Sequence, residues 1–199
     1  MTKGGDTRSS IVREALSLAT SVGLEGVSLG VLASRLDLSK SGLFAHFKSK
    51  EALQIAVIDE ARERFAERVV LPALAKPRGE PRVQALFENQ LKWSENNGLG
   101  SGCIFMALVQ EYDDRPGPLR DRVVDSQREW RDIIAKAVTL AAREGHFRKD
   151  TDAEQFAFEF VGLATSFQES HKLFRDKSAK MRAHTGFERL LASVRARRN

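Results

Sequence analysis

Four residues close together in the sequence could read the edges of DNA bases: Lys40, Ser41, Gly42 and His46. The Lys40 ammonium can donate to guanine or to a phosphate, and the Ser41 hydroxyl can both donate and accept. Gly42 has no side chain, so the backbone could approach DNA closely there. Recognition in the major groove uses groups of these kinds. His46 could add a pH-sensitive contact, although an exposed histidine beside DNA is more often only a polar surface residue.

This stretch lies in a pattern of two short helices joined by a tight turn. Ser28 is a favourable N-cap for the first helix, and apolar residues recur at helical spacing behind it. Asp37 follows where the chain must turn, and aspartate tolerates the left-handed backbone conformation. Ser39 caps the second helix, in which Leu43 and Phe47 are expected to point into the core. This helix-turn-helix pattern presents the start of its second helix to the major groove.

The sequence contains no arrangement typical of an enzyme or a metal site. The histidines at positions 46, 146, 171 and 184 lack the HxxxH and HExxH spacings. Cys103, the single cysteine, lies in the apolar run CIFMAL, where we expect packing, with redox sensing as the alternative. The glycine-rich run 97–102 lacks a following Gly-Lys-Ser/Thr, so we interpret it as a loop. We therefore expect no enzyme activity, no cofactor and no metal.

The composition places further bounds on the protein. A chain of 199 residues suits one or two domains, and 42% hydrophobic with 30% charged residues is typical of a globular protein in water. The single cysteine excludes an intramolecular disulfide. The sequence has neither a signal peptide nor an apolar stretch long enough to cross a bilayer, so we expect a cytoplasmic protein with no membrane partner. Of the net charge of +5, residues 1–50 contribute +3, as a DNA-binding segment requires.

The run from Leu38 to Leu53, LSKSGLFAHFKSKEAL, resembles the N-terminal DNA-binding domain of the TetR family of bacterial transcriptional repressors. The resemblance extends over residues 8–55. The family pattern has a pair of small residues after a capping serine, then an aromatic residue, Phe, Lys, Glu and an apolar residue, and all are present. The chain departs from the pattern twice. Asp37 stands where the family usually has Gly, and Phe44 stands where a Tyr hydroxyl usually reaches a DNA phosphate.

The resemblance implies a homodimer that binds double-stranded operator DNA of palindromic sequence. It also implies which residues would contact the DNA, with Lys50 as the strongest phosphate contact. We expect the DNA-binding residues to be Ser28, Ser39, Lys40, Ser41, Gly42, Phe44, His46 and Lys50. Thr7 is a further candidate for positioning. Arg35 could also reach a phosphate, with simple solvation as the alternative for Arg35 and Lys48.

Helical periodicity extends through the rest of the chain, with no strand pattern. The first helix, residues 7–22, carries Ile11, Ala15, Leu18 and Val22 on one face and ends at Gly23. A long helix begins at residue 50 and ends at Pro72, at a proline-rich break over residues 72–81. Further helices are expected over residues 82–96 and 103–112, up to residue 144, from residue 151, and over residues 178–195. We predict an all-α fold, with a three-helix DNA-binding domain over residues 1–52 and a helical effector-binding and dimerisation domain over residues 53–199.

The two C-terminal helices carry more apolar surface than one domain needs. Phe156, Phe160 and Phe167 form one stripe of the helix that begins at residue 151, whereas Phe158 and Val161 fall on other sides. A helix that is apolar on more than one face must be covered on more than one face. We therefore expect a homodimer through these two helices, as the family resemblance also implies.

The TetR resemblance implies a small-molecule effector that binds in the helical body and releases DNA. Apolar walls with few polar groups would suit a largely apolar effector. The predicted pocket residues are Trp93, Phe105, Met106, Val109, Tyr112, Trp130, Phe160 and Phe167, with Gln110, Gln127, Gln168 and His171 as possible polar contacts. Ordinary core packing is the alternative for each aromatic residue. The alternative for the whole chain is a helical small-molecule-binding or redox-sensing protein without specific DNA binding.

Overall fold

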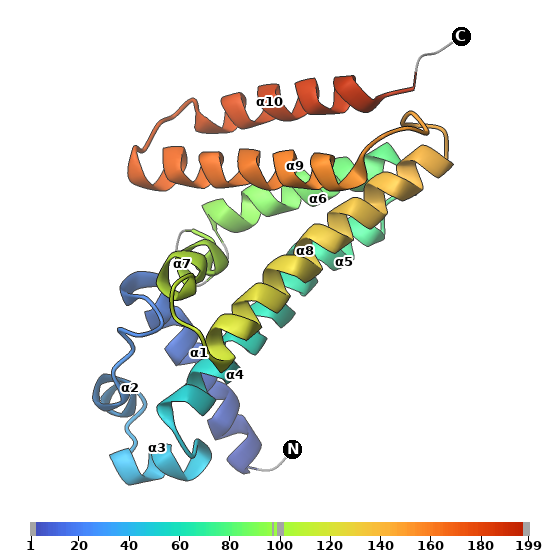
Figure 1. Ribbon diagram of the computed structural model, residues 1–199. Helices are drawn as coiled ribbons and strands as arrows, with labels where there is room; N and C mark the ends of the chain where they lie inside the picture. The colour runs from blue at the N-terminus through green and yellow to red at the C-terminus, as the bar shows by residue number, and fades with distance from the viewer. Residues whose placement is uncertain (1–2, 97, 99–101, 197–199) are drawn as a thin grey trace. The chain divides into compact units, whose positions relative to one another are not determined.

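The computed structural model describes residues 3–96, 98 and 102–196 (Figure 1). Its regular structure is helical, which confirms the predicted all-α fold. The elements are α1 (Lys3–Val22), α2 (Leu29–Arg35), α3 (Lys40–His46), α4 (Lys50–Phe65), η1 (Ala66–Val70), α5 (Leu71–Leu74), α6 (Glu80–Glu95), α7 (Ile104–Tyr112), α8 (Pro118–Arg143), α9 (Ala153–Gln168), η2 (Glu169–Leu173) and α10 (Ala179–Val194). Most of the glycine-rich run, residues 97 and 99–101, lies outside the described residues.

The chain divides by packing into two compact units. The first unit contains residues 1–64 and 98–126, and the second contains residues 65–97 and 127–199. Residues from α7 and the start of α8 thus pack in the same unit as the helix-turn-helix. The expected boundary between functional domains at residues 52 and 53 stays a prediction, because this division describes packing alone.

The first unit has a core drawn from α1, α2, α3 and α4. Ile11, Leu32, Leu43 and Val57, one from each helix, are at most 1% exposed. Burying an aliphatic side chain of this size stabilises a fold by about 1.5–3 kcal/mol. The two short helices α2 and α3, too short to be stable alone, are therefore held by the apolar side chains that they place against α1 and α4.

The expected break at Pro72 is wrong, because helical structure continues to Leu74. The turn before the proline is the π-helical segment η1, and Pro72 occupies the first turn of α5. A proline lacks the backbone N–H of a regular helix and clashes with the carbonyl four residues before it, and a wider π-helical turn accommodates both effects. The chain breaks after Leu74, and α6 begins at Glu80 behind Gly79, whose φ of 96° suits glycine.

The second unit is built around stacked phenylalanine rings. Phe87 of α6 and Phe187 of α10 stack with centroids 3.9 Å apart, and Phe160 of α9 meets both edge-on. Figure 1 shows α9 and α10 running side by side, as their mutual packing requires. The start of α9 is fixed by Asp152, whose carboxylate accepts hydrogen bonds from the backbone N–H groups of Glu154 and Gln155.

Candidate nucleic-acid interface

The turn between α2 and α3 has the geometry that a helix-turn-helix requires. The Ser39 hydroxyl oxygen accepts a hydrogen bond of 3.0 Å from the backbone N–H of Gly42, and the Ser28 oxygen accepts a longer one, 3.5 Å, from Val31. Asp37 adopts a φ of 51° in the turn, which is the left-handed conformation that the sequence predicted for it. Both caps and the turn are therefore where the sequence pattern placed them.

Lys40 and Ser41, the first two residues of α3, are both exposed. Among the described residues, no acidic side chain lies within ion-pair distance of Lys40. The Ser41 hydroxyl lies 3.0 Å from that of Ser39. Phe44, further along, is 47% exposed, whereas Gly42 and His46 are half-buried. The structure thus brings the expected base-reading residues together on one short helix.

Two arginines of the first unit, both exposed, contact other residues of the chain. The Arg35 guanidinium lies 2.9 Å from a carboxylate oxygen of Glu14, so Arg35 ties α2 to α1. The Arg8 guanidinium lies over the ring of Phe47, 4.8 Å from its centroid. Arg35 therefore pairs with Glu14 in this conformation, while its side chain stays 53% exposed.

Glu25, in the segment between α1 and α2, gathers three polar side chains. The Lys50 ammonium donates to the Glu25 backbone carbonyl at 2.8 Å and to its carboxylate at 3.1 Å. The other carboxylate oxygen accepts from Gln54 at 3.1 Å and from the Tyr112 hydroxyl at 2.9 Å. Glu25 therefore occupies two of the three N–H donors of Lys50, the expected phosphate contact, and leaves at most one for DNA.

Glu111 of α7 adds a second link to the same segment. Its two carboxylate oxygens accept hydrogen bonds from the backbone N–H groups of Leu24, at 2.9 Å, and Glu25, at 2.6 Å. We refer to Glu25, Lys50, Gln54, Glu111 and Tyr112 as the Glu25 hub. The hub joins the end of α7 to the residues just before α2. Sequence reasoning missed it, because no local pattern relates residues more than 80 positions apart.

Two residues of the Glu25 hub, Glu25 and Tyr112, have shifted pKa values. Burial alone would raise the pKa of the Glu25 carboxyl, but hydrogen bonds from Tyr112, Lys50 and Gln54 outweigh burial and lower this pKa below its ordinary value. Burial, and then the hydrogen bond to Glu25, raises the pKa of the Tyr112 hydroxyl well above its usual range. At neutral pH the hub therefore contains a Glu25 carboxylate and a neutral tyrosine that donates to it.

The predicted pocket residues fall in both units. Phe105, Met106, Val109 and Tyr112 lie on α7 in the first unit, and the Tyr112 hydroxyl is bonded to Glu25. Trp93, Trp130, Phe160 and Phe167 lie in the second unit. Phe167 stacks on His171 with centroids 5.4 Å apart, whereas Trp130 meets Phe160 edge-on at 5.9 Å. Their role in effector binding stays a prediction.

Two polar residues of the second unit were missed at the level of sequence. Gln90 and Ser94 lie among the buried residues of α6, at 3% and 1% exposure. A signal was available, because both occupy positions of helical spacing relative to Leu86, Phe87 and Leu91, where an amphipathic helix places apolar side chains. Gln110, by contrast, is exposed.

The described residues offer little for other chemistry. No group of three or more His, Cys, Asp or Glu side chains that could hold a metal is found within them. Cys103 is buried at 4% exposure, and oxidation of a cysteine requires access, so the redox alternative gains no support. None of the helices in the described part of the chain is long and apolar enough to cross a membrane.

Two family models match the chain. The model for bacterial regulatory proteins of the tetR family matches residues 11–57, which include α2 and α3. The model for the tetracyclin repressor-like C-terminal domain matches residues 79–187, which is more than half of the chain.

Individual proteins of known sequence or structure are similar along most of the chain. The transcriptional regulator TcmR of Streptomyces glaucescens is 27% identical over 201 residues, covering 85% of each chain. A TetR transcriptional regulator from Chloroflexus aurantiacus J-10-FL has a TM-score of 0.88 at 25% identity, over 99% of this chain and 100% of that one. AibR, solved with isovaleryl coenzyme A and operator DNA, shares the fold with a TM-score of 0.72 at 21% identity, over 89% and 94% of the two chains.

Proposed function

The chain belongs to the TetR family of bacterial transcriptional regulators, and from that membership we propose that it is a repressor released from a palindromic operator by a small effector. One observation carries the proposal: α3 presents Lys40 and Ser41 at the N-terminal end of the second helix of a helix-turn-helix, both exposed and with no acidic side chain of the described residues paired to Lys40. That end of the helix is the part that enters the major groove in this motif.

The expected DNA-binding residues would fall into two groups: those that read bases and those that position α3 on the DNA. Lys40, Ser41 and Gly42 would read base edges, because they lie in the first turn of α3. Ser28, Ser39, Phe44 and His46 would contact the sugar-phosphate backbone or the groove wall. The Ser39 hydroxyl already accepts a bond from the Gly42 N–H and lies 3.0 Å from the Ser41 hydroxyl, so part of its hydrogen-bonding capacity is used within the protein.

Lys50 would bind a phosphate through its remaining N–H donor or after it leaves Glu25. The Glu25 hub therefore connects DNA binding to α7, which supplies two of the hub's five residues. A shift of α7 on effector binding would move Glu111 and Tyr112, and with them the segment that holds Lys50. We expect this coupling to change operator affinity by about 1–3 kcal/mol, the usual range for a ligand that shifts an equilibrium at a distant site.

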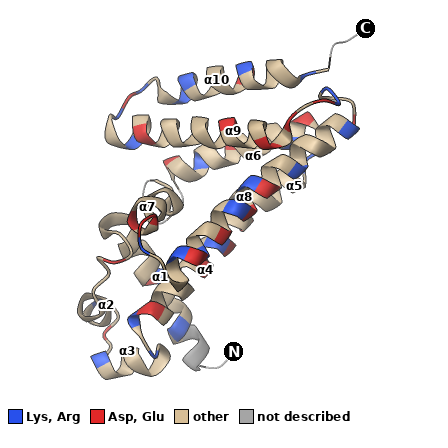
Figure 2. Cartoon of the chain, viewed as in Figure 1, with Lys and Arg blue, Asp and Glu red and all other residues tan. Residues whose placement is uncertain are grey.

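The outer face of α9 and α10 would form the dimer interface. Phe158 of α9 and Met181 of α10 are 61% and 63% exposed, and Leu173 and Phe174 beyond α9 are 69% and 67% exposed. Figure 2 shows few charges along α9, whereas α8 carries many of both signs. Large apolar side chains in contact with water are characteristic of an interaction surface.

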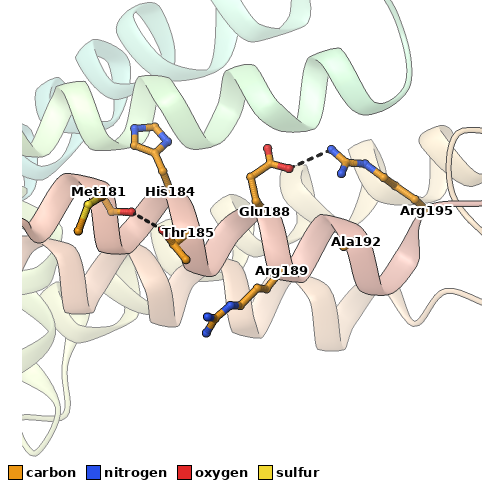
Figure 3. A pocket seen from close by; sticks show the side chains of 7 residues that line it. All are labelled: Met181, His184, Thr185, Glu188, Arg189, Ala192 and Arg195. Atoms are coloured by element: carbon orange, nitrogen blue, oxygen red, sulfur yellow. Dashed lines mark hydrogen bonds and ion pairs between the residues drawn. The ribbon is translucent and has the colours of Figure 1, made fainter.

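Small residues between these apolar side chains would let two helices approach closely. A Cβ atom added at Gly162 of α9 would meet no atom within 4 Å. On α10 an open hollow follows the helix itself, as Figure 3 shows. It is lined by Met181, His184, Thr185, Glu188, Arg189, Ala192 and Arg195. A shallow hollow along one helix fits a helix of a second copy better than a small effector, which needs an enclosing site.

DNA binding can be tested before any operator is known. The purified chain is titrated into a pool of fluorescent random-sequence duplexes at several salt concentrations, and binding is followed by anisotropy. We expect affinity to fall steeply with salt, by about 10³-fold or more between 50 and 200 mM for six or more phosphate contacts. A folded chain that does not bind the pool at the lowest salt would refute the proposed function.

A further inference from the structure

Besides Arg82 Nε, whose guanidinium donates to the backbone through another nitrogen, three polar atoms on α6 are buried and have no hydrogen-bond partner among the described residues. They are Oε1 of Gln90, Nε1 of Trp93 and Oγ of Ser94. All three residues are at most 3% exposed. Their positions, i, i+3 and i+4, place them on one face of the helix. Buried polar groups in folded proteins are almost always hydrogen-bonded, so three unsatisfied groups on one face require a specific explanation.

Trp93 also belongs to an aromatic cluster, which it forms with Phe65, Trp130 and Phe160 from other helices. Trp93 meets Phe65 edge-on with centroids 5.5 Å apart, and Phe65 meets Trp130 in the same way at 4.9 Å. Trp130 in turn meets Phe160 at 5.9 Å. The unsatisfied N–H of Trp93 thus belongs to a ring that is already part of this cluster. The three polar atoms and the aromatic cluster therefore lie in the same part of the second unit.

The π-helical turn η1 follows directly after Phe65 and packs against α6. Asn89, next to Gln90, donates a 3.0 Å hydrogen bond to the backbone carbonyl of Val69 within this turn. The structure therefore satisfies the polar group that serves the π-helical turn and leaves those of Gln90, Trp93 and Ser94 unsatisfied. Such turns are enriched at functional sites, because the wider turn can rearrange at low cost.

We propose that Gln90, Trp93 and Ser94 bind the polar group of a small neutral aromatic ligand. Trp93 can only donate, so the ligand must offer an acceptor, and the Gln90 carbonyl oxygen can only accept, so the ligand must offer a donor. The Ser94 hydroxyl can do either. A hydroxyl or an amide group supplies both functions, and none of the three side chains carries a charge that would select an ion. The inference rests on the proposed function for its role as effector site, and it replaces a largely apolar effector with a hydrogen-bonding one.

The two tryptophans of the chain make this site directly observable. Both Trp93 and Trp130 belong to the aromatic cluster, so a ¹⁵N-labelled chain gives two indole N–H signals, which a Trp130→Phe variant assigns. The probe is 2-naphthol, and 2-methylnaphthalene is its match in size without donor or acceptor. We expect 2-naphthol to shift the Trp93 signal downfield and to bind at least about tenfold more tightly in calorimetry.

Substitutions on α6 separate hydrogen bonding from packing. Gln90→Leu and Ser94→Ala should each weaken 2-naphthol binding by about tenfold and leave 2-methylnaphthalene unaffected. Gln155→Leu, at an exposed position of α9, is the matched control and should change neither. If Gln90→Leu does not fold, Ser94→Ala, a smaller change, carries the comparison alone.

Three outcomes would overturn the inference: equal affinity for the two probes, an unmoved Trp93 signal, or full 2-naphthol binding by both variants. Each would mean that ordered water satisfies the three polar atoms. Because the probe is titrated without DNA, this result is separate from the proposed function. A chain that binds DNA but not 2-naphthol would refute only the ligand site on α6. A chain that binds 2-naphthol but not DNA would refute only the DNA-binding proposal.

Discussion

Two lysines of the helix-turn-helix show how much a residue's role depends on its immediate neighbours. The Lys40 ammonium has no acidic partner among the described residues, so it is available to a base or a phosphate. The Lys50 ammonium is bound twice by Glu25, once through the backbone and once through the carboxylate. The family resemblance points to both residues, but the structure pairs Lys50 with Glu25 and gives Lys40 no acidic partner among the described residues.

Lys40→Ala should weaken binding to the preferred operator by about tenfold or more without changing thermal stability. The physical reason is the loss of a base or phosphate contact, which is worth about 1–3 kcal/mol, from a side chain that packs against little else. Anisotropy titration at fixed salt measures the change. Lys149→Ala, an exposed lysine of the second unit, is the control. Equal affinity of Lys40→Ala and wild type would exclude Lys40 from the interface.

Glu25 should make the stability of the first unit depend on pH. Its pKa is lowered in the folded state, so its contribution is complete above the ordinary value of 4.5 and is lost as the pH falls through the lower folded value. Thermal unfolding of wild type and Glu25→Gln should therefore differ at pH 7 and converge in acid. Glu51→Gln, at another exposed glutamate, controls for the loss of a charge. A difference that persists unchanged into acid would contradict this role.

At the scale of elements, α7 is tied to the segment before α2 by side chains and not by apolar packing alone. Glu111 and Tyr112, adjacent at its C-terminal end, both reach Glu25. Their partners include two backbone N–H groups that no helix satisfies. Removal of the Glu111 side chain would leave the partly buried Leu24 N–H without this partner, which costs more than the hydrogen bond contributes.

Glu111→Ala should free the Leu24 and Glu25 amides. We expect hydrogen exchange at these two positions to accelerate by about tenfold, which corresponds to the loss of about 1.4 kcal/mol of local protection. Nuclear magnetic resonance resolves both amides. Asp113→Ala, two residues on, removes a carboxylate that accepts only from the neighbouring Asp114 N–H and should leave them unaffected. Unchanged exchange in Glu111→Ala would show that the hub does not hold this segment.

Local pattern predicted much of the fold and less of the sites. The caps at Ser28 and Ser39 each depend on a residue and its next three neighbours, so sequence reasoning identified both. Val22 was wrongly assigned to the buried face of α1 and is 55% exposed, because the helix ends there and Leu24 enters the core instead. The helix past Pro72 could not be predicted, since the π-helical turn that permits it has no clear sequence signature.

Whether a candidate site could be predicted also depends on whether its residues are close together in the sequence. The residues of α3 are contiguous, so their shared surface follows from one helix. The Glu25 hub joins residues from three separate parts of the chain, the segment before α2, α4 and α7, and only the folded chain brings them together. Gln90 and Ser94 could have been found, because a polar residue in the apolar face of an amphipathic helix is a visible exception.

At the scale of the whole molecule, the proposed function requires two copies of the chain. One helix-turn-helix reads a few base pairs, and a palindromic operator needs two heads related by a two-fold axis. The exposed apolar side chains of α9 and α10 supply a surface that a second copy could cover symmetrically. Dimerisation and specific DNA binding should therefore be lost together.

Phe158→Glu should convert the proposed dimer to a monomer with its fold intact. A charge placed among apolar side chains at the interface would be buried without a partner, whereas position 158 is 61% exposed within one chain. Light scattering after size exclusion measures the mass, and circular dichroism confirms the fold. Leu74→Glu, which alters an exposed apolar residue of α5, should remain dimeric. A Phe158→Glu chain with the same mass as wild type would place the interface elsewhere.

The most direct test is selection of bound duplexes from a random DNA library by the purified full-length chain at near-physiological salt, followed by sequencing. We predict an enriched palindrome whose half-sites are centred about 34–36 Å apart, or somewhat more, as two α3 helices of a symmetric dimer require. Enrichment of a single half-site, or no enrichment by protein shown to be folded and dimeric, would contradict the account.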